Sequence, residues 1–107
     1  MTKVRVNAGP CGFVTTVTAE KVDRRTVRIS LDTGCPAHNK MMEALGDTFG
    51  VRETVAARPG CGPFYEYAKE NHPAHAGCPV FSAIAKCAEA EMGMALKRDV
   101  EIRFVEE

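Results

Sequence analysis

The sequence has no net charge and no hydrophobic run long enough to cross a membrane, and these two absences exclude two classes of partner. Its 14 basic residues balance its 14 acidic residues over 107 positions. Nucleic acids and anionic membrane surfaces both favour a basic face, so we expect neither as the main partner. A membrane-spanning helix needs about 20 consecutive apolar residues, and no such stretch occurs.

The N-terminus also lacks the apolar run of a signal peptide, because residues 1–6 alternate as a strand does. We therefore predict a cytoplasmic protein. In a reducing compartment, five cysteines are better explained as metal ligands or reactive thiols than as disulfides. The odd number of cysteines also fits a fully paired disulfide framework badly.

Signatures of common chemistries are missing as well. No nucleotide-binding loop, Ser-His-Asp order or pair of catalytic carboxylates stands out, so we do not predict an enzyme. The chain contains no C-x-x-C pair, which excludes the strong zinc-ribbon pattern. If its cysteines bind a metal, they come from separate elements of the fold.

The first third of the chain has the pattern of an antiparallel hairpin. Val4 and Val6 alternate with polar residues and predict a short first strand. Residues 13–20 and 26–31 alternate in the same way, and a short polar link joins them.

Helical spacing replaces this alternation after Cys35 and ends at Gly46. The apolar positions of this first helix are Ala37, Met41, Ala44 and Leu45. Further helices are predicted over residues 51–56, 63–70 and 79–92. Val100, Ile102 and Phe104 alternate again and predict a last strand.

Strands, helices and a final strand thus follow one another in blocks. This order predicts an α+β fold, with a mostly antiparallel sheet, helices packed on one face and an added C-terminal strand. The length fits one domain over residues 1–107.

Three cysteines precede predicted helices. Cys35 and Cys78 are each followed by a proline, which fits the first position of a helix, and Cys61 is followed by Gly-Pro. A helix N-terminus offers free N–H groups and a partial positive charge, and both favour a thiolate. Cys11 lies between a proline and a glycine just before a strand, so its sulfur should be accessible. We expect Cys11, Cys35 and Cys78 to converge at one end of the fold.

Other candidate residues have plainer alternative explanations. Cys87 lies on the apolar face of the last helix and is expected to be a small core residue. His75 is a candidate metal ligand or a solvated loop residue, and for His38 and His72 the solvated interpretation is favoured further. Asp32 is interpreted as a turn residue.

Cys11-Gly12, Gly34-Cys35 and Cys78 resemble, in order and spacing, the three cysteines of the iron–sulfur scaffold family of IscU, SufU and the N-terminal domain of NifU. The resemblance covers roughly residues 10–92. It implies that the first cysteine opens a hairpin, the second ends it and the third starts the last long helix. We also expect a relation to a small uncharacterised family from anaerobes that carries the same three cysteines.

The chain departs from that family in several places. Phe13 replaces the family's aspartate after Cys-Gly, and Gly77 replaces the histidine before the third cysteine. Residues 72–75 replace the chaperone-recognition stretch, and the family's N-terminal helix is missing. The fourth ligand implied by the resemblance could therefore be Cys61 or His75.

These observations predict an iron–sulfur cluster bound by thiolates, in a scaffold, a carrier or a stable cluster protein. A cysteine desulfurase or an apo iron–sulfur acceptor protein is then a possible partner, and a homo-oligomer is possible. Two alternatives stay open: a structural or regulatory zinc module, and a persulfide relay through an activated Cys35 or Cys78.

Overall fold

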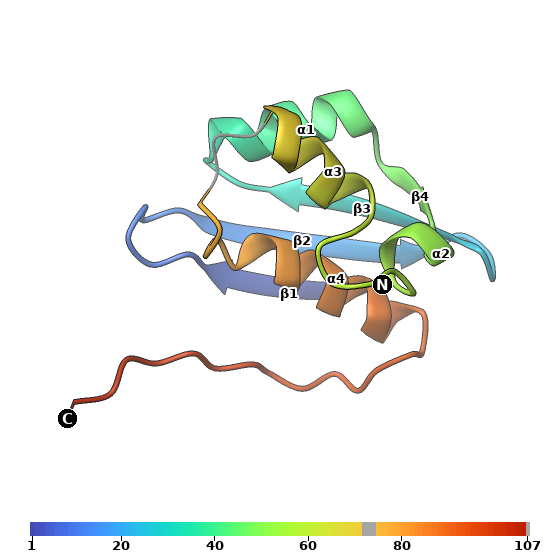
Figure 1. Cartoon of the computed structure of the whole chain (residues 1–107). Coiled ribbons are helices and arrows are strands. Elements are labelled where there is room, and N and C mark those ends of the chain that lie inside the picture. Colours follow the sequence, from blue (N-terminus) through green and yellow to red (C-terminus); the bar gives the residue numbers. More distant parts are fainter. Residues whose placement is uncertain (72–74, 107) are drawn as a thin grey trace.

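An antiparallel sheet of four strands forms one layer of the protein (Figure 1). The structure is a computed structural model that describes residues 1–71 and 75–106. The strands lie side by side in chain order and each pairs antiparallel with the next. They are β1 (Thr2–Asn7), β2 (Val14–Lys21), β3 (Thr26–Asp32) and β4 (Thr48–Gly50). The predicted hairpin is confirmed.

The helices form the second layer, on the face that the alternating pattern makes apolar. Val17, Ala19, Val27 and Ile29 of β2 and β3 are fully buried on this face. The helices are α1 (Pro36–Leu45), α2 (Val51–Thr54), α3 (Pro63–Asn71) and α4 (Val80–Glu91). Helix α4 packs on β1 and β2, and α1 packs on β3 and α3. The predicted α+β class with an antiparallel sheet is confirmed.

Two local features differ from the prediction. Strand β4 was not predicted, because three residues are too few for an alternating pattern to be recognised. Helix α1 is rotated from its expected face: Ala44 is exposed, whereas His38 is buried beside Met41. The solvated interpretation of His38 is therefore wrong. His72 lies outside the described residues.

The expected C-terminal strand is wrong. Residues 95–106, all of them described, form no strand, and they run clear of the sheet in Figure 1. The side chains of Val100, Ile102 and Phe104 are 61, 84 and 106 % exposed. Alternation gives a segment the preference for a strand, but only a partner edge turns that preference into one.

The core assignment of Cys87 is confirmed. Its side chain is fully buried, and its Sγ donates to the carbonyl oxygens of Thr2 and Val17 at 3.2 and 3.6 Å. These contacts join the second turn of α4 to β1 and β2. Within the described residues, no helix has both the length and the apolar character that crossing a bilayer requires.

Glu91 fastens the end of α4 to the sheet. Its carboxylate accepts hydrogen bonds from the Lys21 backbone N–H at 2.9 Å and from the Thr2 hydroxyl at 2.7 Å. The N-terminal ammonium lies 3.5 Å from the same carboxylate. The Lys21 N–H, followed by the Thr2 hydroxyl, lowers the pKa of Glu91. The ionised form is therefore the one that stabilises the fold.

We predict that Glu91→Gln destabilises the protein by about 1–2 kcal/mol at neutral pH, because two hydrogen bonds lose their charged acceptor. A carboxyl whose folded pKa is depressed stabilises the fold above its unfolded pKa of about 4.3 and ceases to do so as pH falls through the folded pKa. The difference from wild type should therefore shrink below about pH 4. Urea unfolding at several pH values measures this, with the exposed Glu70→Gln as control. A difference that persists unchanged into acid would contradict the role of the charge.

Candidate functional site

Two loops meet at the end of the sheet where β1 and β3 end and β2 begins. Residues Asn7 and Val14 pair across β1 and β2, and Thr16 pairs with Asp32 across β2 and β3. The loops 8–13 and 33–35 therefore leave the sheet at the same end. The first loop carries Cys11 and the second carries Cys35.

Cys11 lies on an exposed tight turn. The Gly12 N–H donates to the Gly9 carbonyl at 2.9 Å, and both glycines have positive φ, at 82° and 77°. Side chains are strained in that backbone region, so the turn depends on these glycines. The Cys11 thiol is exposed and free, as its sequence context predicted.

Cys35 is the N-cap residue of α1, and Pro36 occupies the first turn, as predicted. The Cys35 N–H donates to the Thr33 hydroxyl oxygen at 3.2 Å. The same oxygen also accepts a hydrogen bond from the Thr15 hydroxyl at 2.7 Å. These bonds tie the start of α1 to β2.

Phe13 contacts the residue before Cys35. A Cβ added at Gly34 would lie 3.1 Å from the Phe13 ring, a tighter contact than most Cβ atoms make. The Phe13 ring therefore packs against Gly34, although Gly34 stays exposed.

Cys78 comes from the other layer, directly before the N-cap of α4. Its Sγ lies 3.5 Å from Nε2 of His38, which is buried in the first turns of α1 with 3 % of its surface exposed. The His38 ring also meets the ring of Phe81 edge to face, at 5.6 Å between centroids. The imidazole of His38 in α1 and the thiol of Cys78 just before α4 therefore face each other.

The electrostatics of Cys78 link it to the other two cysteines. Burial raises the pKa of the Cys78 thiol, and repulsion from the thiolate forms of Cys11 and Cys35 raises it further. The Val80 backbone N–H acts in the opposite direction and is outweighed. The structure thus brings Cys11, Cys35 and Cys78 near enough for their charges to interact.

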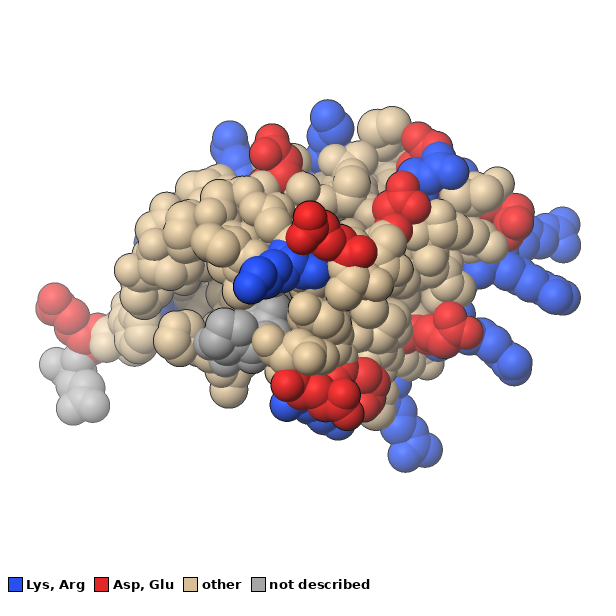
Figure 2. All heavy atoms as spheres, turned by 90° about the horizontal axis from the view of Figure 1, so that it is seen from above, with Lys and Arg blue, Asp and Glu red and all other residues tan. Residues whose placement is uncertain are grey.

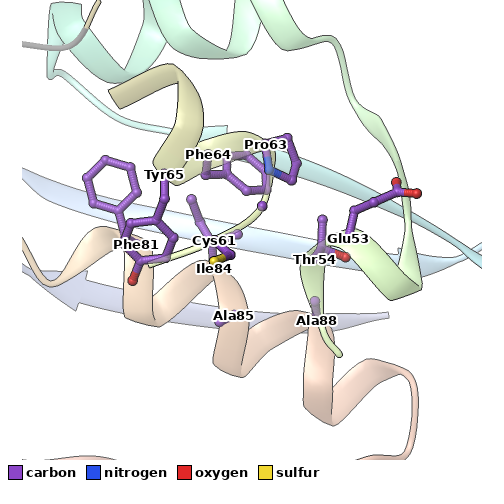
Figure 3. Close-up of a pocket in the computed structure, with 11 residues that line it drawn as sticks. Glu53, Thr54, Cys61, Pro63, Phe64, Tyr65, Phe81, Ile84, Ala85 and Ala88 are labelled. Carbon is purple, nitrogen blue, oxygen red and sulfur yellow. The ribbon is translucent and has the colours of Figure 1, made fainter. Parts of the chain in front are cut away.

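Cys61 is exposed and lines a small pocket together with Tyr65, Phe81 and Ile84 (Figure 3). Ile84 is six residues along α4 from Cys78, which corresponds to about 9 Å of helix. The thiols that raise the pKa of Cys78 through their charge are Cys11 and Cys35, and Cys61 is not one of them.

His75 is exposed, and only its backbone is tied to Cys78: its carbonyl accepts the Cys78 N–H at 3.1 Å. Asp32 is the exposed last residue of β3, in agreement with its interpretation as a turn residue. Of the described His, Cys, Asp and Glu side chains, no three are placed closely enough to hold a metal ion as they stand.

His38 is the site residue whose importance the sequence analysis underestimated. The signal was present, because His38, Met41, Met42 and Leu45 recur at i, i+3, i+4 and i+7, the spacing of one helical face. A polar residue on such a face is buried with the apolar ones, and it then needs a polar partner.

The surface charge gives no sign of a polyanion-binding face in the view from above the helices. Figure 2 shows acidic and basic side chains interspersed over that face.

A comparison with protein families finds one match over residues 2–104, to a family described as "Family of unknown function (DUF6951)". No curated protein and no solved structure matches the chain.

We predict that Cys78 in the folded, metal-free protein reaches its half-maximal alkylation rate at a higher pH than the same cysteine in the urea-unfolded chain, because burial disfavours its thiolate. Iodoacetamide labelling across pH, read out for each cysteine by mass spectrometry, measures this. An equal or lower pH in the folded protein would contradict the described environment.

Proposed function

Because the chain belongs to the DUF6951 family, for which no function is known, we propose a function from the site itself: the protein binds an iron–sulfur cluster through Cys11, Cys35 and Cys78, with His38 as the fourth donor. The chemistry fits, because thiolates are the usual ligands of such clusters and histidine replaces cysteine in some of them. The cluster would supply electron-transfer or cluster-donor chemistry that the side chains lack.

The separation of Cys78 and His38 is the observation that carries the proposal. Metal–sulfur and metal–nitrogen bonds of about 2.3 and 2.0 Å, at a tetrahedral angle, place the two donor atoms about 3.5 Å apart. The Sγ–Nε2 distance is 3.5 Å. The pair therefore already has the spacing of two ligands on one metal.

Charge gives a second argument. Burial, and then repulsion from the thiolate forms of Cys11 and Cys35, raises the pKa of Cys78. A cation between them removes that repulsion, so metal binding and thiol deprotonation favour each other. The same raised pKa disfavours a persulfide relay through Cys78, which would need a ready thiolate in the absence of metal.

Binding requires Cys11 and Cys35 to move toward the Cys78–His38 pair. The Cys11 turn suits this movement, because it is exposed and bounded by glycines. Helices α1 and α4, which carry His38 and Cys78, are packed into the core and would provide the fixed half of the site.

The role within cluster chemistry is part of the same proposal. A hairpin start, a hairpin end and a helix start carry the three cysteines, as the resemblance to IscU, SufU and NifU implies. Transfer partners such as a desulfurase or an acceptor protein remain proposals that follow from it. Because Phe13 stands in place of an exchangeable carboxylate ligand, the proposal favours a retained cluster over a readily released one.

Zinc is the second candidate, since three cysteines and one histidine form a common structural zinc shell with the same bond lengths. Colour and metal content separate the two. A brown protein with iron and acid-labile sulfide supports the cluster, whereas a colourless protein with one zinc supports the zinc site.

We predict that anaerobically purified protein contains iron and sulfide, and that Cys11→Ser, Cys35→Ser and Cys78→Ser each lose most of it. His38→Ala should lower occupancy and shift the absorption spectrum, because one ligand is replaced. Metal and sulfide analysis together with visible absorption measure this. Full retention of metal in the Cys78→Ser variant would contradict the proposal.

The remaining cysteines provide matched controls. Cys87→Ala should keep its metal and lose on the order of 1 kcal/mol of stability, the cost of truncating a small buried side chain. Cys61→Ser should also keep its metal, because His38 supplies the fourth donor in this proposal. Loss of metal in Cys61→Ser, with the fold intact, would show that the loop swings in and that Cys61, in place of His38, completes the shell.

A further inference from the structure

The segment 99–105 is shaped as a strand but has no strand beside it. The side chains of Glu101 and Arg103 form an ion pair and therefore lie on the same side of the extended chain. Val100, Ile102 and Phe104 occupy the alternate positions, and all three are exposed. Extended chain with one apolar side is the pattern of a strand that covers a core. The family match runs to residue 104 and so includes this segment.

The sheet offers one long open edge. Among the described strands β1 pairs only with β2, so its outer backbone groups have no strand partner. The other edge, β4, has only three residues, whereas β1 has six. An open edge of this length can accept an added strand.

The two faces of β1 match the two sides of the segment. Val4 and Val6 pack against the core on the helix side, and Lys3 and Arg5 are exposed on the other. A strand added with its apolar side toward the helices would extend the core beyond Val4 and Val6. Glu101 and Arg103 would then lie on the face that carries Lys3 and Arg5. Opposite charges on adjacent strands stabilise a sheet, so the register that sets Glu101 beside Arg5 is the favoured one.

The segment is out of register with β1 of its own chain. Glu91 touches Thr2, so the tail leaves α4 at the first residue of β1. Ala95 and Val100 are five residues apart, about 17 Å of extended chain, which is the length of a six-residue strand. An extended tail that starts there would bring Val100 level with the end of β1, with Ile102 and Phe104 beyond it. Figure 1 shows the C-terminal tail running past the end of the sheet.

We propose that the β1 edge binds residues 99–105 of a second copy of this chain, and that two copies exchange these segments to form a symmetric dimer. Each sheet then has five strands, and the exposed apolar side chains of each tail are covered. A reciprocal exchange closes the assembly, because both copies use the same two surfaces.

The test is the association state of the full chain, reduced and free of metal, so that neither disulfides nor a shared cluster can join two copies. Sedimentation velocity over about 1–100 µM should show a species of twice the 11.6 kDa monomer mass. Ile102→Glu should weaken dimerisation at least about tenfold, because a carboxylate would be buried against Val4 and Val6. Val105→Glu, three residues on and on the other side of the segment, is the control and should change the dissociation constant less than about twofold.

A charge exchange provides an independent variant that does not disturb the apolar side. Arg5→Glu alone should weaken the dimer, and Arg5→Glu combined with Glu101→Arg should restore it. A wild-type monomer at every concentration overturns the proposal, whether the tail is free or folded onto its own β1. A dimer that survives Ile102→Glu unchanged also overturns it, because another surface would then hold the copies together.

Discussion

The packing of α4 across β1 and β2 determines where every other feature of the molecule lies. Val80, Ile84, Cys87 and Ala88 are buried along this contact, and Glu91 closes it with hydrogen bonds to Thr2 and Lys21. Because both ends of the helix are fixed, Phe81 in its first turn and Cys78 just before its N-cap are held near the cysteine loops. The same contact directs the tail away from the sheet at the Thr2 end of β1. The proposed metal site and the proposed dimer contact thus depend on one helix–sheet interface.

The candidate site combines a packed half and an exposed half. His38 and Cys78 are held by helices whose inner faces are in the core, and Phe81 lies between the rings of His38 and Tyr65. Cys11 and Cys35 lie on loops at the end of the sheet, and the Cys11 turn is fully accessible. In such a site, His38 and Cys78 have the spacing of two ligands of one metal before the metal binds. The thiols of the two loops then move in to complete the shell. The raised pKa of Cys78 means that this closure must come with the loss of a proton.

Much of this architecture follows from local sequence rules. The alternation in residues 13–31 specifies a hairpin whose buried face includes Val17 and Ile29, and the Cys-Pro step at Cys35 marks the start of α1. The convergence of Cys11 and Cys35 then follows, because a hairpin start and a hairpin end share one end of an antiparallel sheet. The position of Cys78 beside them depends on how α4 crosses the sheet, which local pattern does not specify.

The failures of prediction share one cause, since each depended on a tertiary partner. Residues 100–104 have the alternation of a strand but pair with no strand of the described chain. His38 is polar, yet it is buried because the facing surface supplies Phe81 and the thiol of Cys78. Strand β4 exists because β3 offers it an edge, not because Thr48–Gly50 has a marked strand pattern.

The central claim is that Cys11, Cys35, Cys78 and His38 surround one metal centre. A crystal structure of anaerobically purified protein, with anomalous data collected at the iron and zinc absorption edges, tests it most directly, because it locates the metal and identifies it. The account predicts iron atoms bonded to the three sulfurs at about 2.3 Å and to Nε2 of His38 at about 2.0 Å. Metal bound at other residues would contradict the claim. So would a separation of more than about 15 Å between any two of the three sulfurs, because the ligands of one cluster share a site a few ångströms across.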